Sequence, residues 1–407
     1  MNILVICSLL PYPLIDGASK SVFYPIKALA ERGHRVHLAC LTRTMDPDAI
    51  RQVERYCTVD IIEFNSRPSI LGAIRSVASR TPYDIARFQS PALLKRILAR
   101  VAGQHFDVVQ AEGIHAMPYA LAVRERAKIP VLLRVNTIQH VNLLRSVGTY
   151  RNPLINMYLR YEGRKVRAYE ISEGKKADLN LVISDHDGIV LRRLDPSLRC
   201  TTIPAGVELS EFDIGTGPPE PATVLWMGAL KWPPNRDSFW WFYNKIVPHL
   251  LQLVPDVSIR VVGSNPPEDI LKVRHPNVQI VGFVPDIRES VRQATVCVVP
   301  LQVGSGIRIK LLELFAMRKA IVCTSVGAEG LFLENDKQLL IADEPQEFAA
   351  AVARIIRDPG LRTRLGDAGW RHIEKTYTWM RMGELYEQAY RQVLGQEEAT
   401  PPVQPGQ

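Results

Sequence analysis

The sequence lacks several features that would place it in a particular class of protein. No apolar run approaches the roughly 18 residues that a transmembrane helix needs, and residues 3–10 are short and have no basic flank before them. We therefore expect a buried first strand there rather than a signal peptide. The six cysteines show no C-x-x-C spacing, which argues against a structural zinc site and favours small core residues in a reducing compartment. Aromatic residues are not interleaved with basic ones in a nucleic-acid-binding motif, so we expect no nucleic acid partner.

The net charge of +8 is distributed unevenly along the chain. Residues 1–200 carry 29 Lys and Arg against 18 Asp and Glu, whereas residues 201–407 carry slightly more acids than bases. A basic half of this kind can meet an anionic membrane, a phosphate-bearing substrate or nucleic acid. Much of the charge lies in residues 66–103 and in an expected helix at 152–176. Residues 66–103 form either a basic amphipathic surface for anionic lipid or two ordinary surface helices. The helix at 152–176 is expected to present a solvated basic face, unless the acceptor is anionic and meets it.

The length and the alternation of elements predict an α/β protein with two domains. A chain of 407 residues exceeds one ordinary core. Apolar strand-like runs alternate with helical stretches, which predicts two Rossmann-like, doubly wound domains facing across a cleft. The expected division is a first domain at 1–205, a Gly- and Pro-rich hinge at 206–222, a second domain at 223–377, a helix at 378–394 that crosses back to the first domain, and a disordered tail at 395–407.

The stretch 295–331 carries the clearest chemical pattern. A buried strand at Val296–Val299 is followed by a small-residue loop at 304–306 and a helix with Arg308 and Lys310 in its first turn. Cations at this end disfavour a helix unless an anion binds, so the pattern predicts a phosphate site. Glu313 follows Arg308 by about 5 residues and would lie roughly 8 Å further along the helix axis. One sugar ring beyond a bound phosphate would span that distance. The alternative is a solvated helix with a Lys310–Glu313 pair.

Candidate ligand-binding residues also follow the predicted strands of the first domain. Gly17 lies in a loop after the first strand, ahead of a helix expected at Ser21–Arg32, where doubly wound sheets bind ligands; a plain turn is the alternative. Glu112 and His115 follow a strand expected at Asp107–Gln110, and Asn136 follows the next strand. These side chains would gather at one edge of the sheet, although helix capping is the commoner role for such residues.

Nearly the whole chain resembles the group 1 family of retaining glycosyltransferases with the GT-B double-Rossmann fold. The stretches that carry the resemblance occur in the family's order: LLPYPLIDGASKSVF, IPAGVE, WMGALKWPPN, VVGSNP, IVGFVPD, PLQVGSGIRIKLLE and TSVGAEGL. The resemblance implies transfer of a sugar from a nucleotide-activated donor, with no metal or other cofactor and with the anomeric configuration kept. Such a mechanism requires no pair of catalytic carboxylates, and the sequence shows none.

The resemblance also assigns roles to single residues. It implies that the donor diphosphate is held by residues of two loops, the second being of the Gly-x-Gly-x-Arg-x-Lys type: Gly17, Gly304, Ser305, Gly306, Arg308 and Lys310. Glu313 matches the glutamate that grips the ribose hydroxyls. The base would be received by Gly282, Phe283 and Val284. Glu112 stands where many relatives have a histidine at the donor sugar, so Glu112 or His115 would be nearest the reacting centre, with Asn136 as a further candidate contact.

Besides Glu112 in place of a histidine, the chain departs from the family pattern at two further places. Ser305 replaces the first glutamate of the family's Glu, seven residues, Glu motif. Ala229 and Asn235 stand where many members have an arginine and a lysine that bind phosphate. We therefore expect Arg308 and Lys310 to supply the missing charge.

Together these observations predict a glycosyltransferase that acts on a lipid-linked, polysaccharide or other glycan acceptor. The basic first domain favours a cytoplasmic protein at the inner face of an anionic membrane. Two alternatives stay open: a nucleotide-sugar epimerase or hydrolase on the same fold, and a non-catalytic protein that binds nucleotide-sugars.

Overall fold

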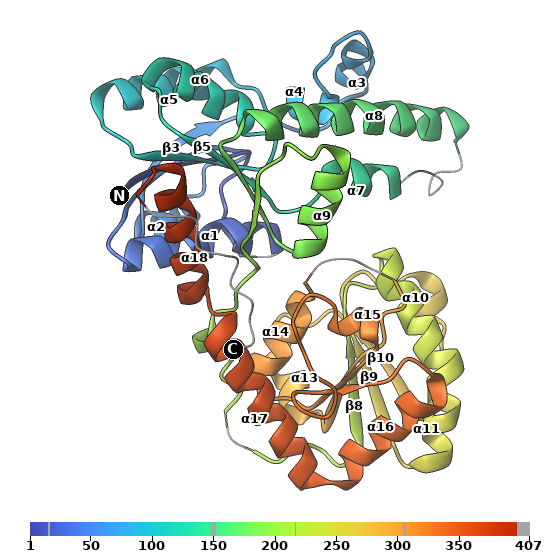
Figure 1. Cartoon of the computed structure of the whole chain (residues 1–407). Coiled ribbons are helices and arrows are strands. Elements are labelled where there is room, and N and C mark those ends of the chain that lie inside the picture. Colours follow the sequence, from blue (N-terminus) through green and yellow to red (C-terminus); the bar gives the residue numbers. More distant parts are fainter. Residues whose placement is uncertain (15–16, 146, 148–151, 216, 304–306, 397–407) are drawn as a thin grey trace. The chain divides into compact units, whose positions relative to one another are not determined.

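A computed structural model describes all residues except 15–16, 146, 148–151, 216, 304–306 and 397–407 (Figure 1). The described chain divides into two compact units, residues 1–204 together with those from Met382 onward, and residues 205–381. Each unit is built on one parallel sheet with helices on both faces. The predicted α/β class with two Rossmann-like domains is confirmed.

The first unit contains a seven-stranded sheet in the order β3-β2-β1-β4-β5-β6-β7. In chain order its strands are β1 (Asn2–Cys7), β2 (Arg35–Thr42), β3 (Thr58–Glu63), β4 (Val108–Glu112), β5 (Val131–Val135), β6 (Leu179–Val182) and β7 (Cys200–Thr202). Central strands such as β1 and β4 are buried because helices cover both faces, although β4 carries the polar residues Gln110 and Glu112. The strand order reverses between β1 and β4, which is where such sheets bind ligands.

Ten helices belong wholly or partly to the described first unit. They are α1 (Gly17–Glu31), α2 (Pro47–Glu54), α3 (Ile70–Val77), α4 (Tyr83–Ala86), α5 (Pro91–Gly103), α6 (Met117–Ala127), α7 (Gln139–Arg145), α8 (Pro153–Lys176), α9 (Asp185–Leu194) and α18 (Trp379–Val393). The last helix starts in the second unit and belongs to the first from Met382 on. There Met382, Tyr386 and Tyr390 are fully buried.

The second unit contains a six-stranded parallel sheet in the order β10-β9-β8-β11-β12-β13. Its strands are β8 (Thr223–Met227), β9 (Ser258–Val262), β10 (Val278–Gly282), β11 (Val296–Val299), β12 (Ile321–Cys323) and β13 (Leu340–Ile341). Its helices are η1 (Leu209–Phe212), α10 (Pro233–Trp241), η2 (Phe242–Ile246), α11 (Val247–Leu253), α12 (Glu268–Leu271), α13 (Arg288–Gln293), α14 (Ile309–Ala316), α15 (Ser325–Ala328), α16 (Pro345–Arg357) and α17 (Pro359–Thr376). Here the order reverses between β8 and β11.

Several predicted boundaries were wrong. Helix α1 begins at Gly17 rather than Ser21, and the Ser21 hydroxyl donates to the Gly17 carbonyl at 2.6 Å, so Gly17 opens the helix instead of lying in a loop. Strand β4 continues to Glu112 because its pairing with β1 runs on to Cys7. Helix α10 starts at Pro233 because proline is favoured at the first helical positions.

The predicted tail at 395–407 lies outside the described residues except for its first two. The predicted hinge at 206–222 contains the short helix η1, and Val207 pairs with Thr378.

Candidate active site

Three glycines lie at the carboxyl ends of neighbouring strands in the second unit. Gly228 follows β8, Gly263 follows β9, and Gly282 ends β10. The Gly263 amide donates to the Gly282 carbonyl at 2.8 Å, and a Cβ atom on Gly263 would lie only 1.8 Å from the Gly228 carbonyl oxygen. No side chain fits at Gly263, so the three strands end in closely packed bare backbone.

The amine of Lys310 lies at this edge of the sheet. Its Nζ donates to the carbonyl of Met227, the last residue of β8, at 3.0 Å and to Oδ1 of Asn235 at 3.1 Å. Asn235 is buried and its own amide donates to the Ala229 carbonyl at 3.1 Å. Because an ammonium group has three N–H donors, the described contacts leave one for a ligand. Lys310 therefore places a cation where the strand order reverses between β8 and β11.

The environment of Lys310 disfavours its charge. Burial, together with the neighbouring Arg308 guanidinium, lowers the pKa of Lys310 from its ordinary value of 10.5 to about 8, while Glu313 acts in the opposite direction. A bound anion would stabilise the charged form. An anionic ligand would therefore stabilise the charged form of Lys310 more than it would stabilise that of an exposed lysine.

Arg308 was predicted to lie in the first turn of α14, but it precedes the helix. It is the N-cap residue of α14, with an extended backbone, and only 6% of it is exposed. Its guanidinium donates to the Val326 carbonyl at 3.4 Å and lies 3.9 Å from a carboxylate oxygen of Glu329. Both contacts link Arg308 to α15 and the turn after it. The predicted loop residues Gly304, Ser305 and Gly306 lie outside the described residues.

The other predicted donor residues occupy the same unit. Glu313 is half-buried on α14, one turn beyond Lys310. Gly282 has a φ of 82°, a conformation that favours glycine, and the register of β10 shifts beside it. The Phe283 side chain is 70% exposed, whereas Val284 packs against the core. An exposed aromatic ring beside this strand end is available to a flat ligand.

In the first unit, Glu112 and Asn136 are brought together. The Asn136 amide donates to Glu112 at 3.2 Å, and Gln110 donates to the other carboxylate oxygen. Only 5% of Glu112 is exposed, and burial raises its pKa, although Arg134 and the two amides oppose this. Sequence reasoning missed Tyr390 of α18, whose hydroxyl donates to Gln110. Only the tertiary structure could bring a residue of the last helix to this cluster.

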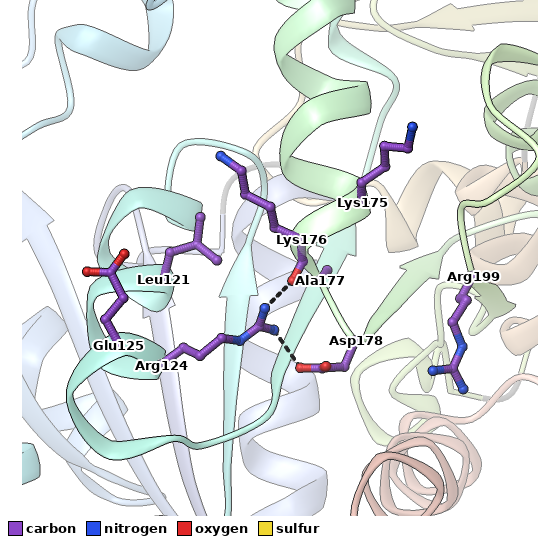
Figure 2. Close-up of a pocket in the computed structure, with 8 residues that line it drawn as sticks. All are labelled: Leu121, Arg124, Glu125, Lys175, Lys176, Ala177, Asp178 and Arg199. Carbon is purple, nitrogen blue, oxygen red and sulfur yellow. Dashed lines mark hydrogen bonds and ion pairs between the residues drawn. The ribbon is translucent and has the colours of Figure 1, made fainter.

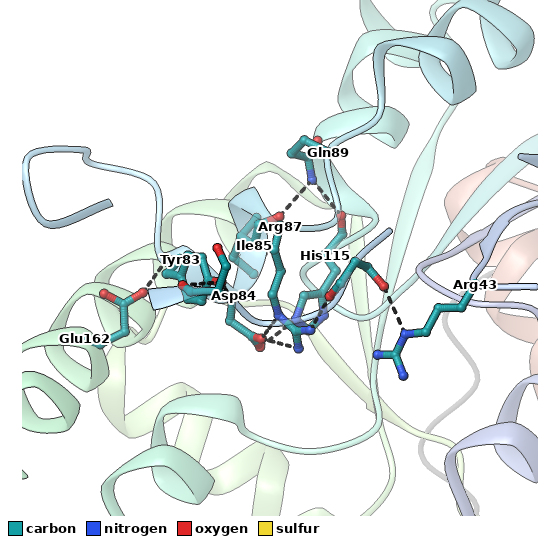
Figure 3. A network of polar contacts seen from close by, with 10 residues as sticks. Arg43, Tyr83, Asp84, Ile85, Arg87, Gln89, His115 and Glu162 are labelled. Carbon is teal, nitrogen blue, oxygen red and sulfur yellow. Dashed lines mark hydrogen bonds and ion pairs between the residues drawn. The ribbon is translucent and has the colours of Figure 1, made fainter. Parts of the chain in front are cut away.

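His115 belongs to a different network, which Figure 3 shows. Its Nε2 lies 2.9 Å from Oδ2 of Asp84, and Arg87 donates to the other oxygen of Asp84 at 2.7 Å. Although burial acts to raise the pKa of Asp84, the His115 and Arg87 contacts hold it at about 2. Asp84 was also missed, although it is the sole acid of residues 66–103. Among the described residues, the hydrogen-bond partners of the Glu112 side chain differ from those of the His115 side chain, so the two are distinct candidates.

Gly17 and Glu112 lie at the reversal point of the first sheet. Gly17 opens the helix that follows β1, and Glu112 ends β4, the strand beside β1. Ligands of doubly wound sheets bind at this position. Each unit therefore has candidate residues at the point where its own strand order reverses, Gly17 and Glu112 in the first and Lys310 in the second.

A basic pocket of about 490 Å³ lies elsewhere in the first unit, at the C-terminal ends of α6 and α8 (Figure 2). Its charges are largely neutralised within the protein. Arg124 pairs with Asp178, Lys175 with Asp195 at 2.6 Å, and Lys176 with Glu173 at 2.7 Å. Because α8 precedes β6, the pocket lies at the amino ends of the strands, away from the candidate site. We assign these pairs a structural role.

Comparison with known families settles the class of protein. The model of the family described as "Glycosyltransferase Family 4" matches residues 15–211, and that of the family described as "Glycosyl transferases group 1" matches residues 221–358. The chain is a glycosyltransferase. The two matched segments contain all of the candidate residues described above. This agrees with the family resemblance of the sequence motifs.

This glycosyltransferase is similar to a curated protein of Klebsiella pneumoniae described as an uncharacterized 44.6 kDa protein in cps region. The two are 22% identical over 369 residues, which cover 86% of this chain and 89% of that protein. Among solved structures, sucrose-phosphate synthase from Thermosynechococcus elongatus has a TM-score of 0.64 at 17% identity and covers 98% of this chain and 100% of its own. Anabaena HepE in complex with UDP has a TM-score of 0.64 at 14% identity, with coverage of 96% and 100%. These likenesses establish the GT-B fold of the glycosyltransferase.

Proposed function

We propose that this glycosyltransferase moves a sugar from a nucleotide-sugar donor to a lipid-linked, polysaccharide or other glycan acceptor, with retention of the anomeric configuration and without a metal ion. The observation that carries the proposal is the Lys310 amine at the end of β8, beside Arg308 and the bare backbone of Gly228 and Gly263. A nucleoside diphosphate leaves readily only if its developing negative charge is stabilised. Lys310 and Arg308 would provide that stabilisation electrostatically.

The roles of the remaining residues follow from their positions. Gly17 and residues 304–306 would contact the diphosphate, Glu313 the ribose, and Gly282 to Val284 the base. Glu112 ends β4, where the strand order of the first sheet reverses, and accepts from Asn136, whereas His115 pairs with Asp84 away from it. On the position of its strand, Glu112 would be the candidate nearest the reacting centre. The structural relative HepE was solved with UDP and with UDP-glucose, which supports a donor of this class.

We further propose that the acceptor lies at the cytoplasmic face of an anionic membrane, approached through the basic first unit. Within the described residues, no helix is both long and apolar enough to cross a bilayer. Peripheral association would then depend on surface charge and on exposed apolar side chains.

The donor is tested by thermal stabilisation of the full chain with UDP, GDP, ADP and dTDP. A ligand that binds only the folded protein raises the melting temperature by an amount that grows with the logarithm of its concentration divided by its Kd, so at equal concentration the tightest-binding nucleotide should give the largest shift. The matching nucleotide-sugar is then incubated with EDTA and an acceptor panel, and the anomeric configuration of the product is read by NMR. An inverted product, or activity abolished by EDTA, would refute the corresponding part of the proposal. Free sugar or an epimer formed without acceptor would favour the hydrolase or epimerase alternative.

A further inference from the structure

An exposed apolar surface lies on α3 and the N-terminal half of α8. Its apolar members are Leu71, Ile74 and Val77 of α3 and Leu154, Ile155, Met157 and Tyr161 of α8. Ile74 and Met157 are each 63% exposed, and Leu154 is 67% exposed. We call this set the α3–α8 surface. Single exposed apolar residues are ordinary, but seven on two neighbouring helices indicate an interaction site.

Two hydrogen bonds join α3 to α8, so the exposed residues of both helices belong to one surface. The Tyr161 hydroxyl donates to the Val77 carbonyl at 2.8 Å, and Nζ of Lys165 donates to the Ser76 carbonyl at 2.8 Å. Both bonds join the C-terminal end of α3 to the middle of α8. Figure 1 shows α3 beside α8 at the edge of the first unit.

The charges around this surface have one sign. Arg75, Arg80, Arg160 and Arg164 are exposed, and none of them forms an ion pair with a described carboxylate. The segment from residue 66 to residue 83 contains no acid. Basic groups at the margin of an apolar helix face are typical of helices that lie in a bilayer interface.

All three acids of α8 are buried and have partners within the protein. Glu162 accepts from the Tyr83 amide, Glu170 holds His140, and Glu173 pairs with Lys176. Each glutamate is at most 5% exposed. The exposed side of α8 therefore combines Leu, Met and Tyr with Arg and presents no carboxylate. The arginine guanidiniums stay positively charged over the whole physiological pH range, and they are complementary in charge to lipid phosphate groups.

We infer that the α3–α8 surface docks the protein on an anionic lipid bilayer, with the apolar side chains entering the interface and the four arginines contacting headgroups. This deepens the proposed function, because it states how the protein reaches an acceptor at a membrane. The apolar side chains give a component of binding that salt does not screen, and the arginines give a component that salt weakens.

The test uses the full chain and extruded vesicles of phosphatidylcholine alone or with 30% phosphatidylglycerol, in a flotation assay. Ile74→Ser with Met157→Ser should lower the partition coefficient on the mixed vesicles by about 10- to 100-fold, because two large apolar side chains no longer enter the interface. Arg75→Gln with Arg164→Gln should lower it by about 10- to 30-fold at low salt and by much less at high salt. The matched control is Met45→Ser with Ile189→Ser, which alters two exposed apolar residues of the same unit outside the surface.

Equal binding to neutral and anionic vesicles, or an equal loss in the control variant, would overturn the inference. It would also be overturned if the parent failed to bind, or if sedimentation showed a dimer that Ile74→Ser and Met157→Ser abolish, since the surface would then cover a second copy of the chain. Nucleotide-induced thermal stabilisation is measured on every variant. Its retention shows that the fold is intact, and its absence in the parent would count against the proposed function instead.

Discussion

At the scale of single residues, Lys310 and Asn235 change how the site is understood. Sequence reasoning treated Asn235 as a lost cation. In the structure its side chain holds the Lys310 amine at 3.1 Å across 75 residues of sequence. The cation at the end of β8 is thus supplied from α14 and positioned by an amide. The family resemblance leads one to expect a lysine at position 235, and here the lysine that reaches this point is Lys310 of α14.

Arg308→Ala should reduce donor use by roughly 10- to 100-fold. A charge-assisted contact contributes about 1.5 to 3 kcal/mol, and that contribution acts on the leaving diphosphate. The measurement is kcat/KM with a confirmed donor. Arg318→Ala is the control, because this exposed arginine pairs with Asp367. Parental turnover by the Arg308 variant would refute its role as a phosphate ligand.

The affinity for nucleoside diphosphate should fall as pH rises above about 8. The pKa of Lys310 is about 8, so above that pH the free protein has a neutral amine and binding must take up a proton. Calorimetry between pH 7 and 9, in buffers with different ionisation enthalpies, measures this uptake. The same pKa makes the free energy of unfolding rise with pH between about 8 and 10.5, because there the unfolded chain holds the extra proton.

Asn235→Asp is the matched variant for this pH dependence. A carboxylate at Asn235 would favour the charged amine and raise the pKa of Lys310, so the decline in affinity should begin at higher pH. An identical pH profile for parent and variant would show that Lys310 does not control nucleotide binding.

At the scale of elements, close helix packing supports α14, which carries Lys310. A Cβ atom on Gly369 of α17 would lie 2.1 Å from Cδ1 of Phe315, and one on Gly366 would lie 2.2 Å from the Arg318 carbonyl oxygen. Phe315 belongs to α14 and Arg318 follows it. The two glycines allow α17 to approach the back of this helix.

Gly369→Ala should lower the free energy of unfolding by about 1 to 3 kcal/mol, because the added methyl group overpacks the contact with Phe315. Helix propensity alone predicts a gain of about 1 kcal/mol from the same change. Urea denaturation of this variant and of the control Gly103→Ala distinguishes the two effects. A Cβ atom on Gly103 meets nothing within 4 Å, so the control reports helix propensity without overpacking. Stabilisation of the Gly369 variant would contradict the packing argument.

At the scale of the whole molecule, the last helix completes the first unit. Met382, Tyr386 and Tyr390 are buried there, and Arg32 pairs with Glu387 at 2.6 Å. Tyr390 also reaches Gln110, the partner of Glu112. A segment that the chain order places after the second unit is therefore part of the core and of the candidate site of the first.

Truncation after Arg381 should destabilise the first unit and leave the second largely protected. Hydrogen exchange read by mass spectrometry would show faster exchange in β1 and β4 than in β8 and β11. Truncation after Gln396, which removes only the polar end of the chain, is the control and should leave both sheets unchanged. Equal deprotection of the two sheets by the first truncation would contradict this assignment.

Much of the fold could be predicted because local patterns report it directly. Apolar runs such as residues 296–299 and the glycines and prolines around them indicate buried parallel strands. Helix starts were less predictable: Gly17 opens a helix despite its turn propensity, and Arg308 caps one. Capping depends on backbone conformation, which composition alone does not set.

The sequence by itself determined the α/β class, the two sheets and the glycosyltransferase family, since periodicity and ordered motifs are local properties of the chain. Only the tertiary structure decided which side chains meet. The contacts of Lys310 with Asn235, of His115 with Asp84, and of Tyr390 with Gln110 join residues far apart in sequence. Such contacts, and the pKa shifts that burial produces, depend on how the elements pack, and no spacing along the chain encodes them.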